Sequence, residues 1–363
     1  MNKTIGIVTI YDPNPNYGNR LQNYAVQTVL ENMGYSTVTY SFEKDYFNKK
    51  EFLKYIIQWM TGYHLPGDTL YWKNIPSKIL RFRKFNKKYI KTKRITSLEE
   101  IDARDYYVIG SDQVWNASWY GNDDLRKNMY LLTFAAPEKR ICFSPSFGVD
   151  QLPKEWESWF KKYLSEFRML SVREAAGAKI IKDLLGKSAT VLVDPTMMLS
   201  KEIWEKIEKK PPHIIKKDYV LTYFLSPKCD EADTLLKSLG TYNEVYELMN
   251  SEKNTLKGIG PSEFLWLFNH AKLILTDSFH ACVFSFLFDK PFLVYDRNWK
   301  ENSTNSRLET LLSKFDLERK YVNSGKKNSL LEHDYSNGYK QLELERKITM
   351  DYLRKALEDE YCG

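Results

Sequence analysis

The chain alternates short apolar runs with segments in which apolar residues recur every three or four positions. The apolar runs are rich in Val, Ile, Leu and Tyr, and several of them end in Gly, Asp or Ser. This alternation predicts α/β construction with parallel strands, because a crossover, usually helical, must connect two parallel strands. Runs that stay apolar throughout are typical of strands buried on both faces.

Two series of such strands are separated by a charged, proline-bearing stretch at 197–217. The first series predicts an N-terminal Rossmann-like domain over 1–196, with a helix at 20–33 and strands near 4–10, 35–40, 106–110, 140–146, 168–172 and 189–195. The second series predicts a C-terminal Rossmann-like domain over 218–337, with strands near 219–225, 244–248, 272–277 and 292–296. We expect residues 197–217 to form a linker and residues 338–363 to form one long amphipathic helix.

The length of 363 residues suits two domains that each bury a core of their own. Apolar runs stay well below the roughly 20 residues that a membrane span requires, and the first residues lack the features of a signal peptide. Four cysteines are scattered without any CxxC pair, which argues against a disulfide framework or a zinc site: Cys142, Cys229, Cys282 and Cys362. These features predict a cytoplasmic protein.

Part of the net charge of +7 is concentrated at 73–94, which holds ten Lys or Arg and no acidic residue. Phe82, Phe85 and Tyr89 are interleaved with these cations. Such a stretch can bind nucleic acid, dock on the anionic inner face of a membrane, or form an amphipathic helix with a solvated face. Nucleic acid is the least favoured of these interpretations, because the chain has only one such patch.

The segment TDSFHACVFSFLFDKPF, residues 276–292, contains one histidine in an otherwise apolar helix. Asp277, Ser278 and His280 fall at the end of a predicted strand and in the first turn of that helix. Ligands of open α/β sheets gather at the carboxyl ends of the strands, and a helix N-terminus favours an anion. His280 is therefore a candidate acid–base residue, and the alternative is a packed histidine bonded to a backbone carbonyl.

Five motifs follow one another along the chain: NYGNRLQNYA at 16–25, GSDQVWN at 110–116, SVRE at 171–174, VDPT at 193–196 and TDSFHACVFSFLFDKPF. In this order and spacing the chain resembles the polysaccharide pyruvyl transferase family. The resemblance implies a fold like that of GT-B glycosyltransferases, with two Rossmann-like domains facing a cleft. It also implies that a pyruvyl group moves from phosphoenolpyruvate, without a further cofactor, onto a sugar as a ketal.

The same resemblance implies roles for two residues. The family histidine at the place of His280 is regarded as an acid–base group, and Arg173 in SVRE matches an arginine assigned to the donor's phosphate or carboxylate. A trianionic donor requires at least two cations beside the acid–base residue. The alternative for Arg173 is a surface arginine in the first turn of a helix, where its charge opposes the helix dipole.

The chain departs from the family pattern at one position. Many members carry arginine two residues before the histidine, where this chain has Ser278. The donor then loses one bidentate clamp, so either another cation replaces it or the donor differs. Arg307 is the candidate replacement, with Arg297 and Lys300 behind it, and solvated loop charges are the alternative.

The motif at 16–25 places Asn16, Gly18 and Asn19 between the first strand and the first helix. Glycine permits close backbone approach, and the start of the helix can receive an anion or sugar hydroxyls. An asparagine turn that only caps the helix explains these residues equally well. Asn19 is kept as a candidate for donor binding, together with Arg173, Ser278 and Arg307.

The motif at 110–116 follows a strand in the same way. Asp112 and Gln113 are candidates for holding acceptor hydroxyls, and Trp115 for stacking on a sugar face. The rival interpretation is an N-cap followed by a core tryptophan. Asp194 and Thr196 in VDPT are expected to form a hinge turn with a structural role.

These observations favour an enzyme of surface polysaccharide biosynthesis that acts on a small-molecule donor and a glycan acceptor. Ser278 keeps open a nucleotide-sugar-dependent glycosyltransferase of the GT-B type, and the basic stretch keeps open a non-catalytic polyanion-binding protein. No metal is expected, because no HxxxH, HExxH or acidic pair has the spacing of a metal site. The acceptor sugar and the oligomeric state do not follow from these patterns.

Overall fold

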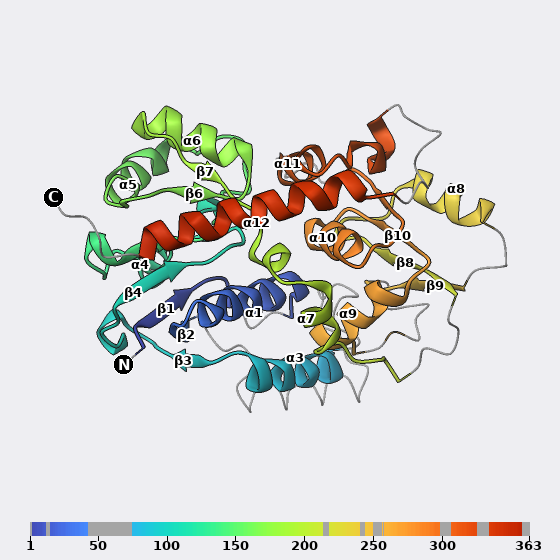
Figure 1. The fold of residues 1–363 in the computed structure, drawn as a ribbon, viewed down its shortest axis with the longest axis horizontal. Coiled ribbons are helices and arrows are strands. Elements are labelled where there is room, and N and C mark those ends of the chain that lie inside the picture. Colours follow the sequence, from blue (N-terminus) through green and yellow to red (C-terminus); the bar gives the residue numbers. More distant parts are fainter. Residues whose placement is uncertain are drawn as a thin grey trace.

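The computed structural model describes residues 2–11, 15–42, 75–212, 218–239, 244–249, 256, 258–297, 306–324 and 334–357. Its strands are β1 (Thr4–Val8), β2 (Ser36–Ser41), β3 (Thr92–Arg94), β4 (Tyr106–Ile109), β5 (Arg140–Cys142), β6 (Ser171–Val172), β7 (Thr190–Val191), β8 (Tyr219–Tyr223), β9 (Glu244–Glu247), β10 (Leu273–Thr276) and β11 (Phe292–Val294). Figure 1 shows these strands in two groups, one in each half of the molecule.

The helices lie between and around the strands (Figure 1). They are α1 (Tyr17–Asn32), α3 (Ile75–Tyr89), α4 (Asp124–Tyr130), α5 (Lys154–Leu164), α6 (Ala175–Leu185), α7 (Lys201–Glu205), α8 (Asp230–Ser238), α9 (Pro261–His270), α10 (Phe279–Leu287), α11 (Ser306–Lys314) and α12 (Ser336–Leu357). Short 3₁₀ turns are η2 (Leu98–Glu100), η3 (Ala117–Trp119), η4 (Pro137–Lys139), η5 (Pro195–Met198), η6 (Glu318–Lys320) and η7 (Val322–Ser324).

Two parallel sheets organise the fold. The N-terminal sheet has the strand order β3-β2-β1-β4-β5, and the C-terminal sheet has the order β11-β10-β8-β9. The pairings within both sheets are parallel, as is the separate pair of β6 and β7. The prediction of two Rossmann-like domains with parallel sheets, arranged as in the GT-B fold, is confirmed.

The strand orders also locate the places where ligands bind in such sheets. In the N-terminal sheet the chain adds β2 and β3 on one side of β1 and then β4 on the other side. In the C-terminal sheet β9 lies on one side of β8, and β10 lies on the other. The loops after β1 and β4, and those after β8 and β10, therefore diverge at a topological switch point, which leaves a ligand-binding crevice in open α/β sheets.

The stretch expected as a linker is partly built into the core. It contains the second half of η5 and all of α7, and the Trp204 side chain of α7 is fully buried. The indole N–H of Trp204 donates to the Thr196 carbonyl at 3.2 Å. Residues 213–217 of the same stretch lie outside the described residues.

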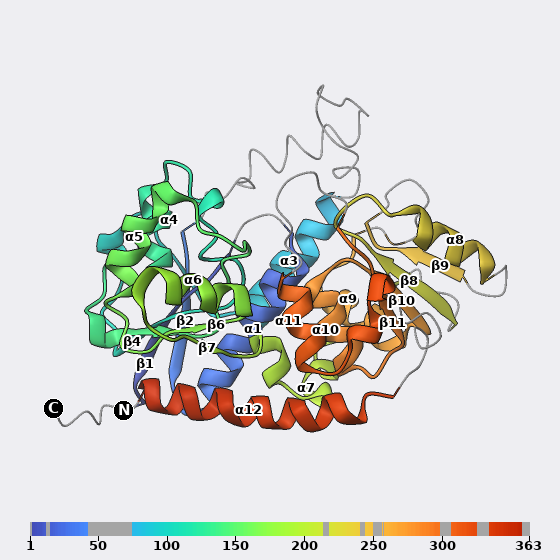
Figure 2. The same cartoon turned by 90° about the horizontal axis from the view of Figure 1, so that it is seen from above.

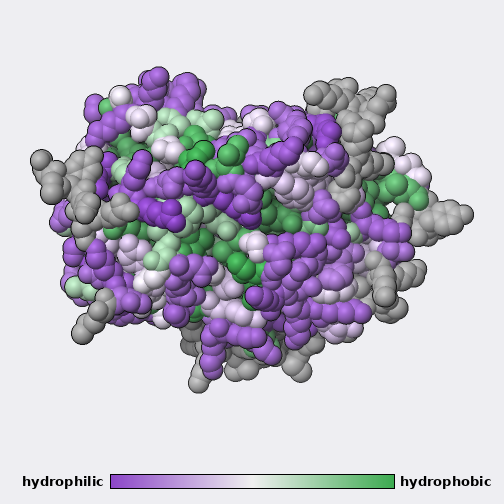
Figure 3. All heavy atoms as spheres, viewed as in Figure 1, coloured by the Kyte–Doolittle hydropathy of each residue, from purple (hydrophilic) through white to green (hydrophobic). Residues whose placement is uncertain are grey.

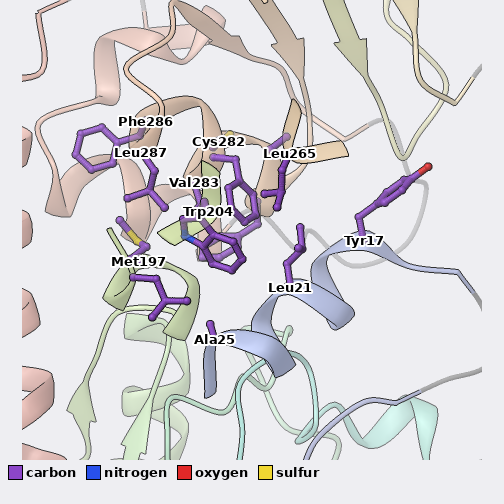
Figure 4. Packing of buried hydrophobic residues seen from close by; sticks show 14 of the residues in the cluster. Tyr17, Leu21, Ala25, Met197, Trp204, Leu265, Cys282, Val283, Phe286 and Leu287 are labelled. Atoms are coloured by element: carbon purple, nitrogen blue, oxygen red, sulfur yellow. The ribbon is translucent and has the colours of Figure 1, made fainter. Parts of the chain in front are cut away.

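A continuous apolar core joins the two domains. Figure 4 shows Leu21 and Ala25 of α1 facing Leu265 of α9 and Val283 of α10, with Trp204 among them. We call these five residues the apolar junction. All five are fully buried, so apolar surface that each domain would otherwise expose is removed from water where the domains meet.

Helix α12 connects the two halves from outside. Figure 2 shows it running along one side of the molecule, past both domains. Arg346 in its middle donates to the carbonyls of Met197 at 2.7 Å and Leu199 at 2.9 Å. The predicted long C-terminal helix is thus confirmed up to Leu357, and residues 358–363 lie outside the described residues.

The basic stretch forms α3, but its aromatic residues face inward. Phe82 and Phe85 are buried, and Phe82 packs against Tyr17 with ring centroids 5.3 Å apart. Arg83, Lys84, Lys87 and Lys88 are exposed on the other side of the helix. Both rings contribute to the core. Phe82 and Phe85 are therefore not available to stack on bases or to insert into a membrane.

The surface seen in Figure 3 mixes hydrophilic side chains with smaller hydrophobic patches. Two large apolar residues of α12, Leu344 and Ile348, are among those exposed to solvent. No helix in the described part of the chain is long and apolar enough to span a membrane.

Candidate active site

Polar side chains from both domains meet at the carboxyl ends of the strands. Their core consists of residues that follow β4, β6, β7 and β10, joined by one residue of α11. We call them the polar cluster: Ser111, Asp112, Gln113, Arg173, Asp194, Thr196, His280 and Arg307. Each has less than a tenth of its surface exposed, so the cluster is an ionic site in a largely dry environment.

Asp194 is at the centre of the cluster. Its Oδ2 accepts from Arg173 Nη1 at 2.7 Å and from Ser111 Oγ at 2.9 Å. Its Oδ1 accepts from the backbone N–H and the hydroxyl of Thr196, at 3.0 and 2.6 Å. Burial by itself raises the pKa of Asp194, but the imidazole of His280, the Arg173 charge and the Thr196 bonds outweigh it and hold that pKa well below the ordinary value.

His280 approaches the same carboxylate from the other domain. Its Nε2 lies 3.7 Å from Asp194 Oδ2. The opposite edge of the ring packs on the first turn of α1, where any side chain at Gly18 would collide with the imidazole. Glycine at position 18 therefore permits the two domains to come together around His280.

Arg173 is buried next to Asp194. Its guanidinium lies 4.4 Å from the centre of the Phe279 ring, and its Nη2 is 3.7 Å from Asp112 Oδ1. Burial alone would lower the pKa of Arg173. The neighbouring carboxylates of Asp194, Asp112 and Glu174 outweigh this effect, so the pKa of Arg173 is raised above its ordinary value. The alternative of a surface arginine is wrong, because Arg173 is 3% exposed.

Asp112 and Gln113 contact arginines in this structure. Asp112 adopts a left-handed backbone with φ of 77°, a strained conformation for a residue other than glycine. With its amide oriented to accept, Gln113 Oε1 lies 2.9 Å from both Nη1 and Nη2 of Arg307. Both side chains thus lie beside the cations of the cluster.

Arg307 has an unusual environment for a buried cation. It is 5% exposed, and among the described residues no carboxylate forms an ion pair with it. Its Nε has no hydrogen-bond partner within the same ranges. Burial, reinforced by the charges of Arg173 and Arg297, lowers the pKa of Arg307 to about 9, although Asp112 and Glu174 act in the opposite direction. A solvated loop charge is therefore wrong for Arg307.

Asp277 and Ser278, beside His280, have different surroundings. The Asp277 carboxylate accepts hydrogen bonds from the backbone N–H groups of Leu225 and Ser226, at 2.7 and 2.9 Å, and these bonds hold the loop after β8 in place. Ser278 is the N-cap residue of α10, and its backbone N–H donates to Thr276 Oγ1 at 3.0 Å. Arg297 Nε donates to the Asp277 carbonyl at 3.1 Å. Lys300 lies outside the described residues.

The first turn of α1 contributes the asparagines. Asn16 caps the helix, with its Oδ1 accepting from the Asn19 backbone N–H at 3.2 Å. Asn19 is 4% exposed, and its Oδ1 has no hydrogen-bond partner among the described residues. Capping thus accounts for Asn16, whereas the side chain of Asn19, one residue after Gly18, keeps an unused acceptor.

One expectation, that Trp115 stacks on a sugar face, is wrong. Trp115 is fully buried, stands 5.3 Å from Phe147 between ring centroids, and donates its indole N–H to the Tyr130 carbonyl at 3.0 Å. It therefore has no face left to stack on a sugar, and the core interpretation holds. Asp194 was expected to form a hinge turn with a structural role. It is the N-cap of η5, and its carboxylate also accepts from Arg173 and lies 3.7 Å from His280 Nε2. Its position directly after the buried residues Leu192 and Val193 was the available signal for these contacts.

The described residues contain no group of three or more His, Cys, Asp or Glu that could hold a metal ion. The polar cluster instead offers two arginines, an imidazole and two buried carboxylates at the junction of two Rossmann-like domains. Such a set suits the binding of an anion next to an acid–base group. Fold and site together define a two-domain α/β protein with a buried polar cluster where the two domains meet.

The chain belongs to the polysaccharide pyruvyl transferase family, whose model matches residues 16–298. It is therefore a transferase that moves a pyruvyl group onto a polysaccharide, with a small-molecule donor and a glycan acceptor. A search among curated proteins finds no match.

Solved structures show likeness of shape at low sequence identity. The UDP-GlcNAc 2-epimerase from Methanocaldococcus jannaschii has a TM-score of 0.46 and 12% identity, over 96% of this chain and 99% of that chain. The UDP-GlcNAc 2-epimerase from Neisseria meningitidis has a TM-score of 0.42 and 11% identity, over 97% and 100%. For the spinosyn forosaminyltransferase SpnP the values are 0.40 and 11%, over 98% and 100%. Likeness at this level carries no functional argument.

Proposed function

We propose that the chain transfers a pyruvyl group from phosphoenolpyruvate to two hydroxyls of one sugar, in a surface polysaccharide or its lipid-linked precursor. The product is a cyclic ketal, and inorganic phosphate is released. The observation that carries this proposal is the burial of Arg307 without a carboxylate partner among the described residues, close enough to Arg173 for the two charges to interact. A buried unpaired cation is costly, and an anionic ligand relieves that cost.

Phosphoenolpyruvate is an enol ether, so the first step is protonation of its methylene carbon. In the proposed mechanism His280 supplies this proton, and the electron pair of the C=C bond forms the new C–H bond. The adjacent carbon becomes electrophilic, a sugar hydroxyl attacks it and loses its proton, and the C–O bond to phosphate breaks. Attack by a second hydroxyl, again with loss of a proton, closes the ketal. An imidazole suits both proton donation and acceptance near neutral pH.

The arginines hold the donor's charges in this scheme. Arg173 and Arg307 are assigned to the phosphate and carboxylate, and Arg307 takes the place of the arginine that many relatives have at the position of Ser278. The Gln113 amide, 2.9 Å from both terminal nitrogens of Arg307, fixes the plane of that guanidinium. This planar fork matches a carboxylate or phosphate in a bidentate manner.

The remaining assignments rest on proximity. Asn19 is assigned to the donor or acceptor through its unused Oδ1, and Asp112 to an acceptor hydroxyl at the rim of the cluster. Gln113 acts on Arg307 and therefore on the donor side. Each assignment predicts a change in the Michaelis constant of one substrate when that side chain is shortened.

Incubation with phosphoenolpyruvate and a panel of glycan acceptors tests the function. We expect release of phosphate in step with formation of a pyruvyl ketal, and loss of both in His280→Gln. A nucleotide-sugar-dependent glycosyltransferase is the competing function, because Ser278 replaces the family arginine. Thermal shift separates the two: phosphoenolpyruvate raises the melting temperature under the first function, and a nucleotide diphosphate under the second.

We also propose that the enzyme works in the cytoplasm and contacts the anionic inner face of the membrane through the exposed cations of α3. Since Phe82 and Phe85 are buried, such contact is electrostatic and free of aromatic insertion. Binding to vesicles with anionic lipid should then disappear at high salt and in a variant with Lys84, Lys87 and Lys88 changed to Glu. Salt-insensitive binding would contradict this part.

A further inference from the structure

We propose that Asp194 is a positioning residue that couples binding of the donor at Arg173 to protonation of His280. This inference rests on the proposed function, because it assumes that an anionic group of the donor contacts Arg173. It adds that the acid–base group becomes charged as the donor arrives.

One carboxylate oxygen serves both partners. Asp194 Oδ2 accepts from Arg173 Nη1 at 2.7 Å and faces His280 Nε2 at 3.7 Å. The other oxygen is held by the backbone N–H and hydroxyl of Thr196 at 3.0 and 2.6 Å. The η5 turn therefore fixes the carboxylate. The Arg173 guanidinium and the His280 imidazole share its other oxygen, and the negative charge of that oxygen stabilises the positive charge of the nearer group.

The contact also crosses the domain junction. Asp194 follows β7 in the N-terminal half, and His280 lies in the first turn of α10 in the C-terminal half. Asp194 is 1% exposed, so its charge is screened little by water and acts strongly on both neighbours.

Other charged groups near His280 are engaged elsewhere. Asp277 directs its carboxylate at the backbone N–H groups of Leu225 and Ser226, and Arg297 Nε donates to the Asp277 carbonyl. The Arg173 guanidinium is paired with Asp194 Oδ2 at 2.7 Å, and the first turn of α1 packs against the imidazole at Gly18. Within the described ranges, no carboxylate other than Asp194 is within 4 Å of a His280 ring nitrogen.

Coupling follows from this arrangement. Without donor, the Arg173 charge neutralises Asp194. A donor phosphate or carboxylate that binds Arg173 competes for its guanidinium, and the negative charge of Asp194 then favours the imidazolium form of His280. The imidazole takes a proton from solvent, forming an N–H bond, before that proton is passed to the donor's methylene carbon. By linkage, protonation of His280 strengthens donor binding to the same extent.

Proton uptake on binding measures this coupling directly. Titration calorimetry at pH 8 in buffers of different ionisation enthalpy gives the number of protons taken up when phosphoenolpyruvate binds without acceptor. We expect an uptake of about 0.3 proton or more per donor in the native enzyme. His280→Gln should show none, and Asp194→Asn should fall to the level of His280→Gln while still binding the donor. Sulfate, which does not titrate in this range, serves as a second anion.

Matched variants keep the test decisive. Thr196→Val retains the carboxylate but removes the hydroxyl that orients it, so it should lower the uptake partially even if Asp194→Asn does not fold. Glu174→Gln changes another carboxylate near Arg173, keeps an oxygen that can accept from the Phe147 backbone N–H, and should keep the native uptake. Native uptake in both Asp194→Asn and Thr196→Val, or equal values for the native enzyme and His280→Gln, would overturn the coupling. A native enzyme that binds no phosphoenolpyruvate contradicts the proposed function itself.

Discussion

Helices α1 and α10 contribute to the apolar junction and also border the polar cluster, one or two turns away along each helix. Helix α1 brings Gly18 against His280 in its first turn and Leu21 and Ala25 into the apolar junction further on. Helix α10 likewise carries His280 near its start and Val283 one turn later. The two regions are thus similarly buried, but one is packed with hydrocarbon and the other with charges.

The apolar junction stabilises the fold, whereas the polar cluster contains the groups assigned to the chemistry. Burial of apolar surface is favourable at every position of the apolar junction. A buried ion network returns little or no net stability, because its members must first be removed from water. The polar cluster therefore persists for its chemistry, and changes in the two regions should affect different measurements.

The largest expected effect is on turnover. His280→Gln should reduce pyruvyl transfer by about 10²–10⁴-fold, because the proton donor is lost. The melting temperature should change little, since Asp194 keeps its bonds to Arg173, Ser111 and Thr196. Phosphate release and thermal unfolding measure the two quantities, and full activity of the variant would exclude His280 as the acid–base group.

The apolar junction should respond in the opposite way. Trp204→Ala should lower the free energy of unfolding by about 3–5 kcal/mol, because it leaves a cavity between α1, α9 and α10. Trp204→Phe is the matched control, which keeps most of the volume but loses the bond to the Thr196 carbonyl and should cost about 1 kcal/mol. Denaturant unfolding measures both, and equal losses would show that packing is not the cause.

Asp194→Asn should show a stability effect that depends on pH. At pH 7 we expect a loss of about 3 kcal/mol, because the variant leaves Arg173 buried without its main counter-charge. The pKa of folded Asp194 lies below its ordinary value of 3.8, so its contribution is present above that value and is lost as the pH falls. The difference in unfolding free energy from the native enzyme should therefore shrink below about pH 4. A difference that stays constant down to pH 2 would contradict the assigned ion pair.

Arg307→Met should cost the fold no stability. Since Arg307 is buried without a carboxylate partner in the described part of the chain, the loss of its charge should raise the unfolding free energy by about 1 kcal/mol or more. Donor affinity should fall roughly tenfold or more, through loss of a charge-assisted bidentate contact. Arg307→Lys should bind with intermediate affinity. Calorimetric titration with phosphoenolpyruvate checks the series, and unchanged affinity in Arg307→Met would exclude this residue from the donor site.

Much of the fold was predictable because strands buried on both faces leave continuous apolar runs in the sequence. The same patterns indicated that Arg173, Asp112 and His280 follow strands, so their gathering at one edge could be expected. The apolar periodicity of α3 was visible too, but it did not show which partner covers Phe82 and Phe85. Tertiary packing against α1 decided that both rings belong to the core.

The sequence by itself determined the parallel α/β architecture, the order of the strands along the chain and the placing of His280 at a strand end. Only the tertiary structure decided that Trp115 is core, that Arg307 is a buried cation and that Asp194 lies between Arg173 and His280. The physical reason is the separation along the sequence of the residues that interact. Apolar periodicity and capping involve residues that are near neighbours in the chain. A carboxylate that faces both a guanidinium 21 positions away and an imidazole in the other domain exists only once both domains have packed.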